Sequence, residues 1–129
     1  MTQKLELYKC EICGNVVEVV LCGEGELVCC NQPMNLLTPK TKDMGEEKHV
    51  PVLEEHDREK MVRVGQIPHP MTQEHYIQFI EVISKDKIWV KRKYLSPNEQ
   101  PEMKFTCDCE NKFDAVEFCN IHGLWGAEF

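Results

Sequence analysis

The sequence predicts an all-β protein of two domains, a small metal-binding domain followed by a β-sandwich. Short β-branched and aromatic runs recur between turn residues, and no stretch of convincing length has the apolar spacing of a helix. Near the amino terminus, four cysteines occur as two close pairs, in a segment too short to bury a stable core by itself. We therefore expect a metal to hold this first domain together.

Length and charge limit the classes of function. A chain of 129 residues has room for a small module and a compact core of about 90 residues. The formal net charge of −7 argues against a nucleic-acid partner, because phosphate binding needs clustered Lys and Arg. Any site for an anion must be locally positive. No apolar run reaches the roughly 20 residues that cross a bilayer, and no signal-peptide core follows Met1, so we expect a cytoplasmic protein without membrane contact.

Three segments follow from the distribution of motifs. Residues 1–37 contain both cysteine pairs and are predicted to form the metal-binding domain. Residues 38–45 are polar, contain turn residues, and are predicted to be a linker. Residues 46–129 form the predicted sandwich domain. Its expected strands are residues 60–64, 75–84, 87–94, 102–106 and 112–119.

The strand predicted over residues 75–84 is apolar on both faces, so we expect it at the centre of a sheet. Strict alternation would place Ile77 and Phe79 on one face. The same alternation would place Ile80 and Val82 on the other.

The first candidate site is a cluster of four cysteines. Cys10 and Cys13 form a C-x-x-C knuckle, whose spacing lets two thiolates chelate one metal. Cys29 and Cys30 are adjacent, and neighbouring side chains on a strand point to opposite faces. This pair can share an ion only if the backbone bends sharply there. Four thiolates suit zinc or iron, so a structural zinc knuckle remains an alternative at this point.

The second candidate site draws on histidines from several segments. Each histidine alone is more often a solvated residue than a ligand. Two local features strengthen the group: Cys119 and His122 form a C-x-x-H chelate beside a glycine, and Pro68 and Pro70 stiffen the loop that carries His69. The candidate ligands are His49, His69, His75, His122 and Cys119.

Six motifs follow one another in a recognisable order, at residues 8–15, 26–31, 47–52, 69–71, 75–77 and 119–123. Together they resemble the desulfoferrodoxin family, the two-iron superoxide reductases of anaerobic microbes. The resemblance runs nearly from end to end of the chain. It implies a desulforedoxin-like first domain, an immunoglobulin-like sandwich as the second domain, and a homodimer.

The resemblance also implies iron at both sites. Centre I would hold iron on Cys10, Cys13, Cys29 and Cys30. Centre II would hold iron on His49, His69, His75 and His122 in a plane, with Cys119 axial.

The implied activity is the one-electron reduction of superoxide to hydrogen peroxide without production of oxygen, in the oxidative-stress defence of an anaerobe. Five ligands on centre II leave one coordination position for a small diatomic, and an axial thiolate favours giving it an electron. Lys48 is expected to supply positive charge at the open face, and Glu47 to occupy the sixth position in the oxidised state. Centre I would receive electrons from an external donor such as a rubredoxin.

Other interpretations remain open from the sequence. Superoxide dismutation ranks lower, because a strongly donating thiolate favours the reductive half of that reaction. A rubredoxin-like electron carrier or a zinc-stabilised binding module would leave the histidines without a role. Lys48 and Glu47 could be solvated loop residues, as His56 is expected to be. Three cysteines depart from the family pattern and are expected to be free or surface thiols, namely Cys22, Cys107 and Cys109.

Overall fold

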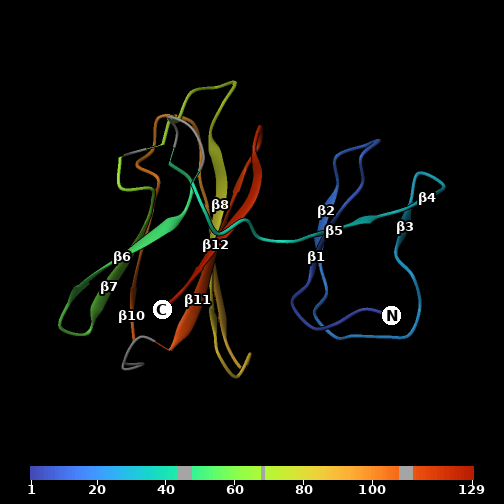
Figure 1. Cartoon of the computed structure of the whole chain (residues 1–129), viewed down its shortest axis with the longest axis horizontal. Helices are drawn as coiled ribbons and strands as arrows, with labels where there is room; N and C mark the ends of the chain where they lie inside the picture. Colours follow the sequence, from blue (N-terminus) through green and yellow to red (C-terminus); the bar gives the residue numbers. More distant parts are fainter. Residues whose placement is uncertain (44–47, 68, 108–111) are drawn as a thin grey trace. The chain divides into compact units, whose positions relative to one another are not determined.

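The computed structural model describes residues 1–43, 48–67, 69–107 and 112–129, which form two compact units, Met1–Thr38 and Pro39–Phe129 (Figure 1). Regular secondary structure in these residues consists of strands alone, so the all-β prediction is confirmed. The described part of the chain likewise contains no helix long and apolar enough to cross a membrane.

The first unit is built from five short strands. They are β1 (Leu7–Lys9), β2 (Val16–Glu18), β3 (Val28–Cys29), β4 (Gln32–Pro33) and β5 (Asn35–Leu37). β1 pairs antiparallel with β2 on one side and with β5 on the other, while β3 and β4 form a separate hairpin. Its buried apolar side chains include Leu7, Cys10 and Val19, a core small enough that a bound metal is needed for stability.

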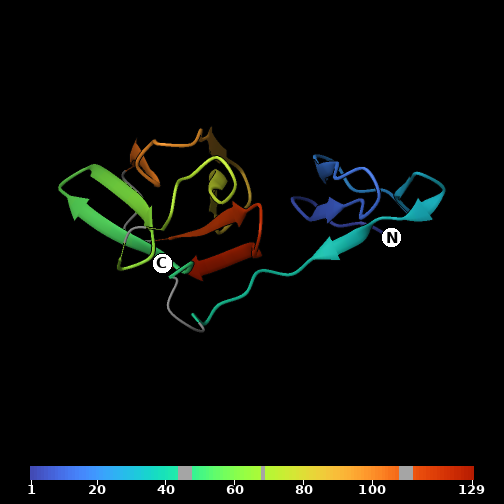
Figure 2. The same ribbon diagram turned by 90° about the horizontal axis from the view of Figure 1, so that it is seen from above.

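The second unit is an antiparallel sandwich. Its strands are β6 (Pro51–His56), β7 (Glu59–Val64), β8 (Ile77–Ser84), β9 (Val90–Tyr94), β10 (Glu102–Thr106), β11 (Phe113–Cys119) and β12 (Gly123–Glu128). One sheet has the order β10-β7-β6 and the other the order β12-β11-β8-β9. Figure 2 shows the green strands β6 and β7 as one layer, apart from the red strands near the carboxyl end. Val62, Ile80, Phe113 and Ala115 are among the fully buried side chains of the core between the sheets.

β8 lies between β11 and β9, which confirms the prediction of a central strand. The register of its pairing with β11 is irregular, because Phe118 pairs with Phe79 and the next residue, Cys119, pairs with Ile77. This bulge reverses the alternation of side chains along β8. Ile77 therefore lies in the core, while Phe79 stacks on Phe118 on the opposite face. The prediction that Ile77 and Phe79 share a face is wrong.

Two strands of the second unit, β6 and β12, were not expected from the sequence. β6 begins with a proline and ends in three titratable residues, and β12 contains two glycines, so both have compositions that are depleted in strands. Both lie at sheet edges, where pairing with one neighbour is enough and a leading proline is tolerated. Three predicted strands also begin later than expected, β8 at Ile77, β9 at Val90 and β11 at Phe113.

Lysines close one side of the sandwich. β9 is the edge of one sheet and β10 the edge of the other. From β9, Lys91 donates to the carbonyl of Thr106 at 3.2 Å and Lys93 donates to that of Glu102 at 3.4 Å. The ammonium of Lys91 also lies 5.6 Å from the ring centre of Phe105. Cationic side chains on an edge strand also discourage pairing with another chain.

Gly65 allows the segment after β7 to pass close to Lys48. Its φ angle is +78°, and a Cβ atom there would lie 2.5 Å from the Lys48 carbonyl oxygen. We predict that Gly65→Ala lowers the free energy of unfolding by about 1–3 kcal/mol, because a strained backbone angle adds to a clash with main-chain atoms. Denaturant unfolding of the iron-loaded protein measures this.

Gly23→Ala is the matched control, since a Cβ atom at Gly23 would have nothing within 4 Å. We expect a change within about 0.5 kcal/mol for this variant. Equal stability of the two variants would contradict the tight packing of Gly65 against Lys48.

Candidate metal centres

Centre I brings together the four cysteines predicted to share a metal. The sulfurs of Cys10, Cys13, Cys29 and Cys30 all lie within 4.8 Å of one another. The C-x-x-C knuckle curls so that the Cys13 N–H donates to the Cys10 sulfur at 3.5 Å. From outside the cysteine set, the side-chain amide of Asn15 donates to the Cys29 sulfur at 3.7 Å. Four converging thiols with N–H donors around them are the ligand set of a tetrahedral thiolate site.

The adjacent cysteines share this site because the backbone turns between them. Cys29 ends β3 and pairs with Gln32 of β4, so Cys30 and Asn31 form a two-residue hairpin turn. Both have positive φ angles, 52° at Cys30 and 61° at Asn31, as this kind of tight turn requires. The sharp bend predicted from the vicinal pair is confirmed. A non-glycine residue such as Cys30 is strained there, which is common at ligand-binding sites.

The proton affinities of the sulfurs show why a cation suits this site. The backbone N–H groups of Cys13 and Ile12 lower the pKa of the Cys10 thiol to about 6. In contrast, hydrogen bonding with Cys13 and Cys10 raises the pKa of Cys30 to about 12. The Cys10 thiol ionises readily, whereas Cys29 and Cys30 hold their protons more tightly. A metal ion replaces those protons, so binding releases them and weakens as the pH falls.

Centre II is assembled from distant parts of the second unit. His49 precedes β6, His69 and His75 lie between β7 and β8, Cys119 is the last residue of β11, and His122 lies in the turn to β12. Their nitrogen and sulfur ligand atoms lie within 4.8 Å of one another. Cys119 is fully buried, and His49 and His69 are each 3% exposed. The structure thus brings all five predicted ligands of this site together.

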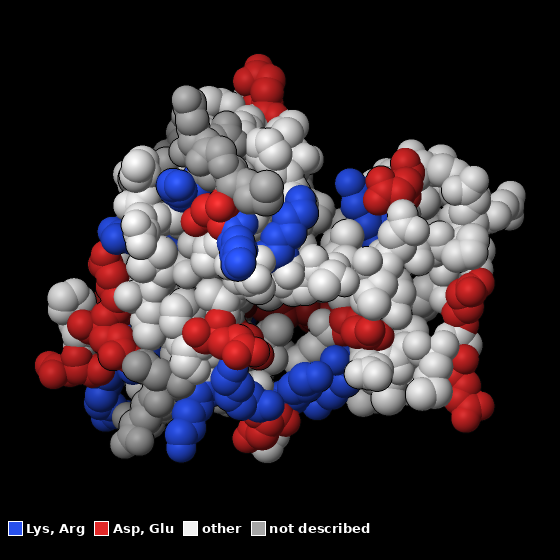
Figure 3. Space-filling view, viewed as in Figure 1, with Lys and Arg blue, Asp and Glu red and all other residues white. Residues whose placement is uncertain are grey.

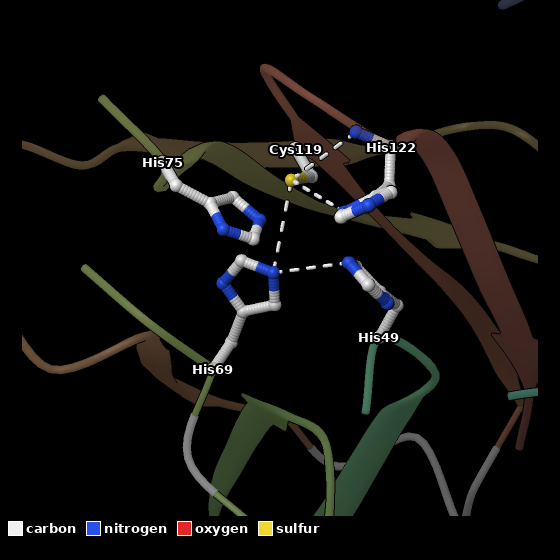
Figure 4. A group of neighbouring side chains, drawn as sticks. All are labelled: His49, His69, His75, Cys119 and His122. Carbon is white, nitrogen blue, oxygen red and sulfur yellow. Dashed lines mark hydrogen bonds between the residues drawn. The ribbon is translucent and has the colours of Figure 1, made fainter. Parts of the chain in front are cut away.

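The four imidazoles of centre II follow one another around a common space (Figure 4). Ring centres of consecutive histidines lie 4.6 Å apart for His49 and His69, 4.7 Å for His69 and His75, 5.0 Å for His75 and His122, and 4.8 Å for His122 and His49. The Cys119 sulfur lies 3.7 Å from Nε2 of His69 and 3.9 Å from Nδ1 of His122. A ring of four nitrogen donors with one sulfur suits iron with a mixed imidazole and thiolate ligand set.

Hydrogen bonds orient these ligands. Nδ1 of His69 lies 2.7 Å from the carbonyl oxygen of Pro70, which can only accept. Nδ1 therefore carries the proton, and Nε2 is left to bind a metal. The backbone N–H of His122 donates to the Cys119 sulfur at 3.4 Å, and this hydrogen bond stabilises the thiolate form of Cys119. These contacts fit a bound metal ion better than four incidental histidines.

Two acidic residues, Asp43 and Glu117, neighbour ligands of centre II. The side chain of Asp43 accepts hydrogen bonds from the backbone N–H of His49 at 2.5 Å and of Val50 at 3.0 Å. Glu117, two residues before Cys119, is fully buried. Burial raises the pKa of Glu117 well above its usual value, and the negative charge of Asp43 adds to the rise.

Three residues that touch ligands of centre II are not among the predicted site residues. Asp43 and Lys40 lie in the predicted linker, and Trp125 lies in no predicted element. Trp125 stacks on His49 with ring centres 4.5 Å apart and an angle of 14° between the planes. The available signal was its position three residues after the ligand His122, on a strand that was not predicted.

The remaining candidate residues have varied outcomes. Lys48 is partly buried beside His49. His56, expected in a solvated loop, is exposed but ends β6.

Cys22 is free and exposed, as expected. Cys107 is disulfide-bonded, so the expectation of a free thiol is wrong there, because spacing cannot show which sulfurs lie within bonding distance. The predictions for Glu47, Pro68 and Cys109 lie outside the described residues.

Comparison with known proteins supports the assignment of both units. The desulfoferrodoxin family model matches residues 41–128, and the model of the desulfoferrodoxin N-terminal domain matches residues 2–37. A desulfoferrodoxin homologue of Archaeoglobus fulgidus is 50% identical over 125 residues, which cover 97% of this chain and 98% of the relative. The desulfoferrodoxin of Syntrophotalea carbinolica is 49% identical over 128 residues, 99% of each chain.

A solved structure is similar over the same length. The superoxide reductase from Treponema pallidum matches with a TM-score of 0.76 and 27% identity, covering 98% of this chain and 100% of that one. Both family models, the full-length relatives and this fold agree with the resemblance carried by the six sequence motifs. The chain belongs to the desulfoferrodoxin family.

Proposed function

We propose that this protein is a superoxide reductase, which reduces superoxide by one electron to hydrogen peroxide without producing oxygen. The observation that carries the proposal is the cluster of four imidazoles and one buried thiol in a member of this family. The two ligand sets fit the two irons of the family, an Fe(Cys)4 centre I and an Fe(His)4Cys centre II. The similarity to the Treponema pallidum superoxide reductase supports the same activity.

Each part of centre II has a chemical task. The four histidines and Cys119 would hold an iron that could bind superoxide and supply the electron. Cys119 contributes a thiolate in a fully buried position, where the backbone N–H of His122 stabilises the charge of the sulfur. The bond from His69 to the Pro70 carbonyl holds that imidazole in one tautomer. The ligands are thus oriented before the substrate arrives.

The substrate is an anion, and the protein carries a net charge of −7. Acidic and basic side chains are interspersed over the face shown in Figure 3. Lys48 supplies positive charge near the iron and holds water for protonation of the product. Its backbone is packed against Gly65, and it directly precedes His49, which keeps it close to the site. For Glu47, which lies outside the described residues, the family resemblance supports a role as a carboxylate that would bind the oxidised iron.

An iron held by the four cysteines of centre I would serve to relay electrons from an external donor such as a rubredoxin. Four thiolates leave no position for superoxide at centre I, so transfer of electrons is the role that fits it. The protein works as a cytoplasmic homodimer in the oxidative-stress defence of an anaerobe.

Product stoichiometry tests the function directly. Fully reduced protein given limiting superoxide should form one hydrogen peroxide per superoxide and release no oxygen, because each substrate ion takes one electron from iron. Peroxide and oxygen electrodes measure both products. Oxygen release at half the superoxide consumed would instead establish dismutation. Zinc at both sites, with no reaction, would establish a zinc-stabilised module.

Reciprocal variants test the division of labour between the centres. Cys119→Ser should abolish the thiolate-to-iron absorption of centre II and the reaction with superoxide, while the spectrum of centre I persists. Cys13→Ser should lose the iron of centre I, yet still react with superoxide once centre II is reduced chemically. Visible spectra, iron analysis and stopped-flow kinetics measure these changes. A Cys119→Ser protein that retained the centre II band would contradict the ligand assignment.

Lys48→Ile tests the local cation. We predict that the second-order rate of reduced centre II with superoxide falls by about tenfold, on the order of 1.4 kcal/mol, with iron retained. The reason is that a cation near the iron acts within the Debye length, about 10 Å at 0.1 M salt, where it outweighs distant charges. Added salt should slow the wild type and slow the variant less.

Lys4→Ile is the control, because it removes the same charge from an exposed position in the first unit. Its rate and salt dependence should match the wild type. Pulse-radiolysis rates across ionic strength distinguish the variants. If Lys48→Ile and Lys4→Ile behaved alike, Lys48 would be only a solvated loop residue.

A further inference from the structure

The segment predicted as a linker is attached to β12 beside centre II. The backbone N–H of Lys40 donates to the Leu124 carbonyl at 3.0 Å, and the N–H of Gly126 donates to the Lys40 carbonyl at 2.9 Å. These two bonds form a parallel bridge between Lys40 and Trp125. Pro39 packs on the same strand, since a Cβ at Gly126 would lie 3.0 Å from it. Lys40 therefore has a defined place in the second unit.

The side chain of Lys40 reaches a ligand of the metal. Its ammonium donates to the backbone carbonyl of His122 at 2.9 Å and lies 5.0 Å from the ring centre of Trp125. The Lys40 side chain is exposed on its other side. These two contacts place the ammonium beside His122 and Trp125.

Trp125 touches two ligands at once. Its indole N–H donates to the same His122 carbonyl at 3.1 Å, and its ring stacks on the imidazole of His49 at 4.5 Å. Trp125 is 5% exposed, so it has little freedom to move. One carbonyl thus accepts two donors, which fixes the turn from Cys119 to His122, while the indole face fixes His49.

We propose that Lys40 and Trp125 are positioning residues of centre II, and that the Lys40 ammonium favours its ferrous state. A nearby positive charge stabilises the less positive of two oxidation states, here ferrous iron, and so raises the reduction potential. The inference rests on the proposed function in one respect only, because ferrous iron is the form that gives an electron to superoxide.

The test compares three variants of the full-length, iron-loaded protein. Lys40→Met removes the charge and keeps the length of the side chain, and Lys40→Arg keeps the charge. Lys42→Met removes the same charge two residues further along, where no hydrogen bond to a centre II ligand occurs among the described residues. A redox titration that follows the thiolate-to-iron absorption of each centre gives both potentials without superoxide.

We expect Lys40→Met to raise the ferric-to-ferrous ratio of centre II at a fixed potential by up to about tenfold, equivalent to a fall of about 59 mV for one electron. Lys40→Arg and Lys42→Met should stay close to the wild type. Centre I serves as an internal reference and should not shift. An unchanged potential in Lys40→Met, or equal shifts in the Lys40→Met and Lys42→Met proteins, would overturn the role of the ammonium.

Trp125→Phe tests the second residue. It retains an aromatic ring against His49 and removes the N–H that binds the His122 carbonyl. We expect release of the centre II iron to a chelator to quicken severalfold, with centre I release unchanged. Wild-type release rates in this variant would overturn the positioning role of Trp125. These readouts need no superoxide, so a failed stoichiometry test and a failed positioning test are distinguishable.

Discussion

Convergence of ionisable ligand atoms on two small volumes is the constraint on which this structure depends. Four sulfurs meet in one cluster, and four imidazoles and a sulfur meet in the other, all within 4.8 Å. Hydrogen bonding with Cys13 and Cys10 raises the pKa of Cys30 to about 12, which expresses the conflict that such crowding creates. A bound metal ion removes this conflict, because its positive charge takes the place of the protons and all the ligands share it. The small first unit depends on that ion most, because its own core is slight.

The sandwich serves centre II as a rigid frame. Cys119 ends a strand buried on both faces, and the bulge opposite it sends Ile77 into the core. The change of face lies where the chain enters β8, two residues after the ligand His75. Asp43 and Trp125 then hold His49 from two sides. The ligands come from loops and strand ends, but backbone bonds and packing restrict each of them, as a redox site with fixed geometry requires.

Charge is arranged locally against the overall acidity of the protein. A net charge of −7 is unfavourable for an anionic substrate. The two lysines assigned to centre II have different tasks in our proposals, Lys48 toward the substrate and Lys40 toward the metal. Two lysines can outweigh the overall acidity because salt screens a charge a few ångströms from the site less than it screens distant surface charges.

The sequence by itself determined the all-β class, the ligand residue types and the need for a bend at Cys29 and Cys30, because these follow from local spacing and composition. It also carried the family, through six motifs in order. Only the tertiary structure decided that Ile77 faces the core, that the glycine-containing segment at residues 123–128 is a strand, and that Lys40 bonds to His122. Such features arise from pairing between segments up to 82 residues apart. Alternation and propensity describe one segment at a time, so they cannot reveal them.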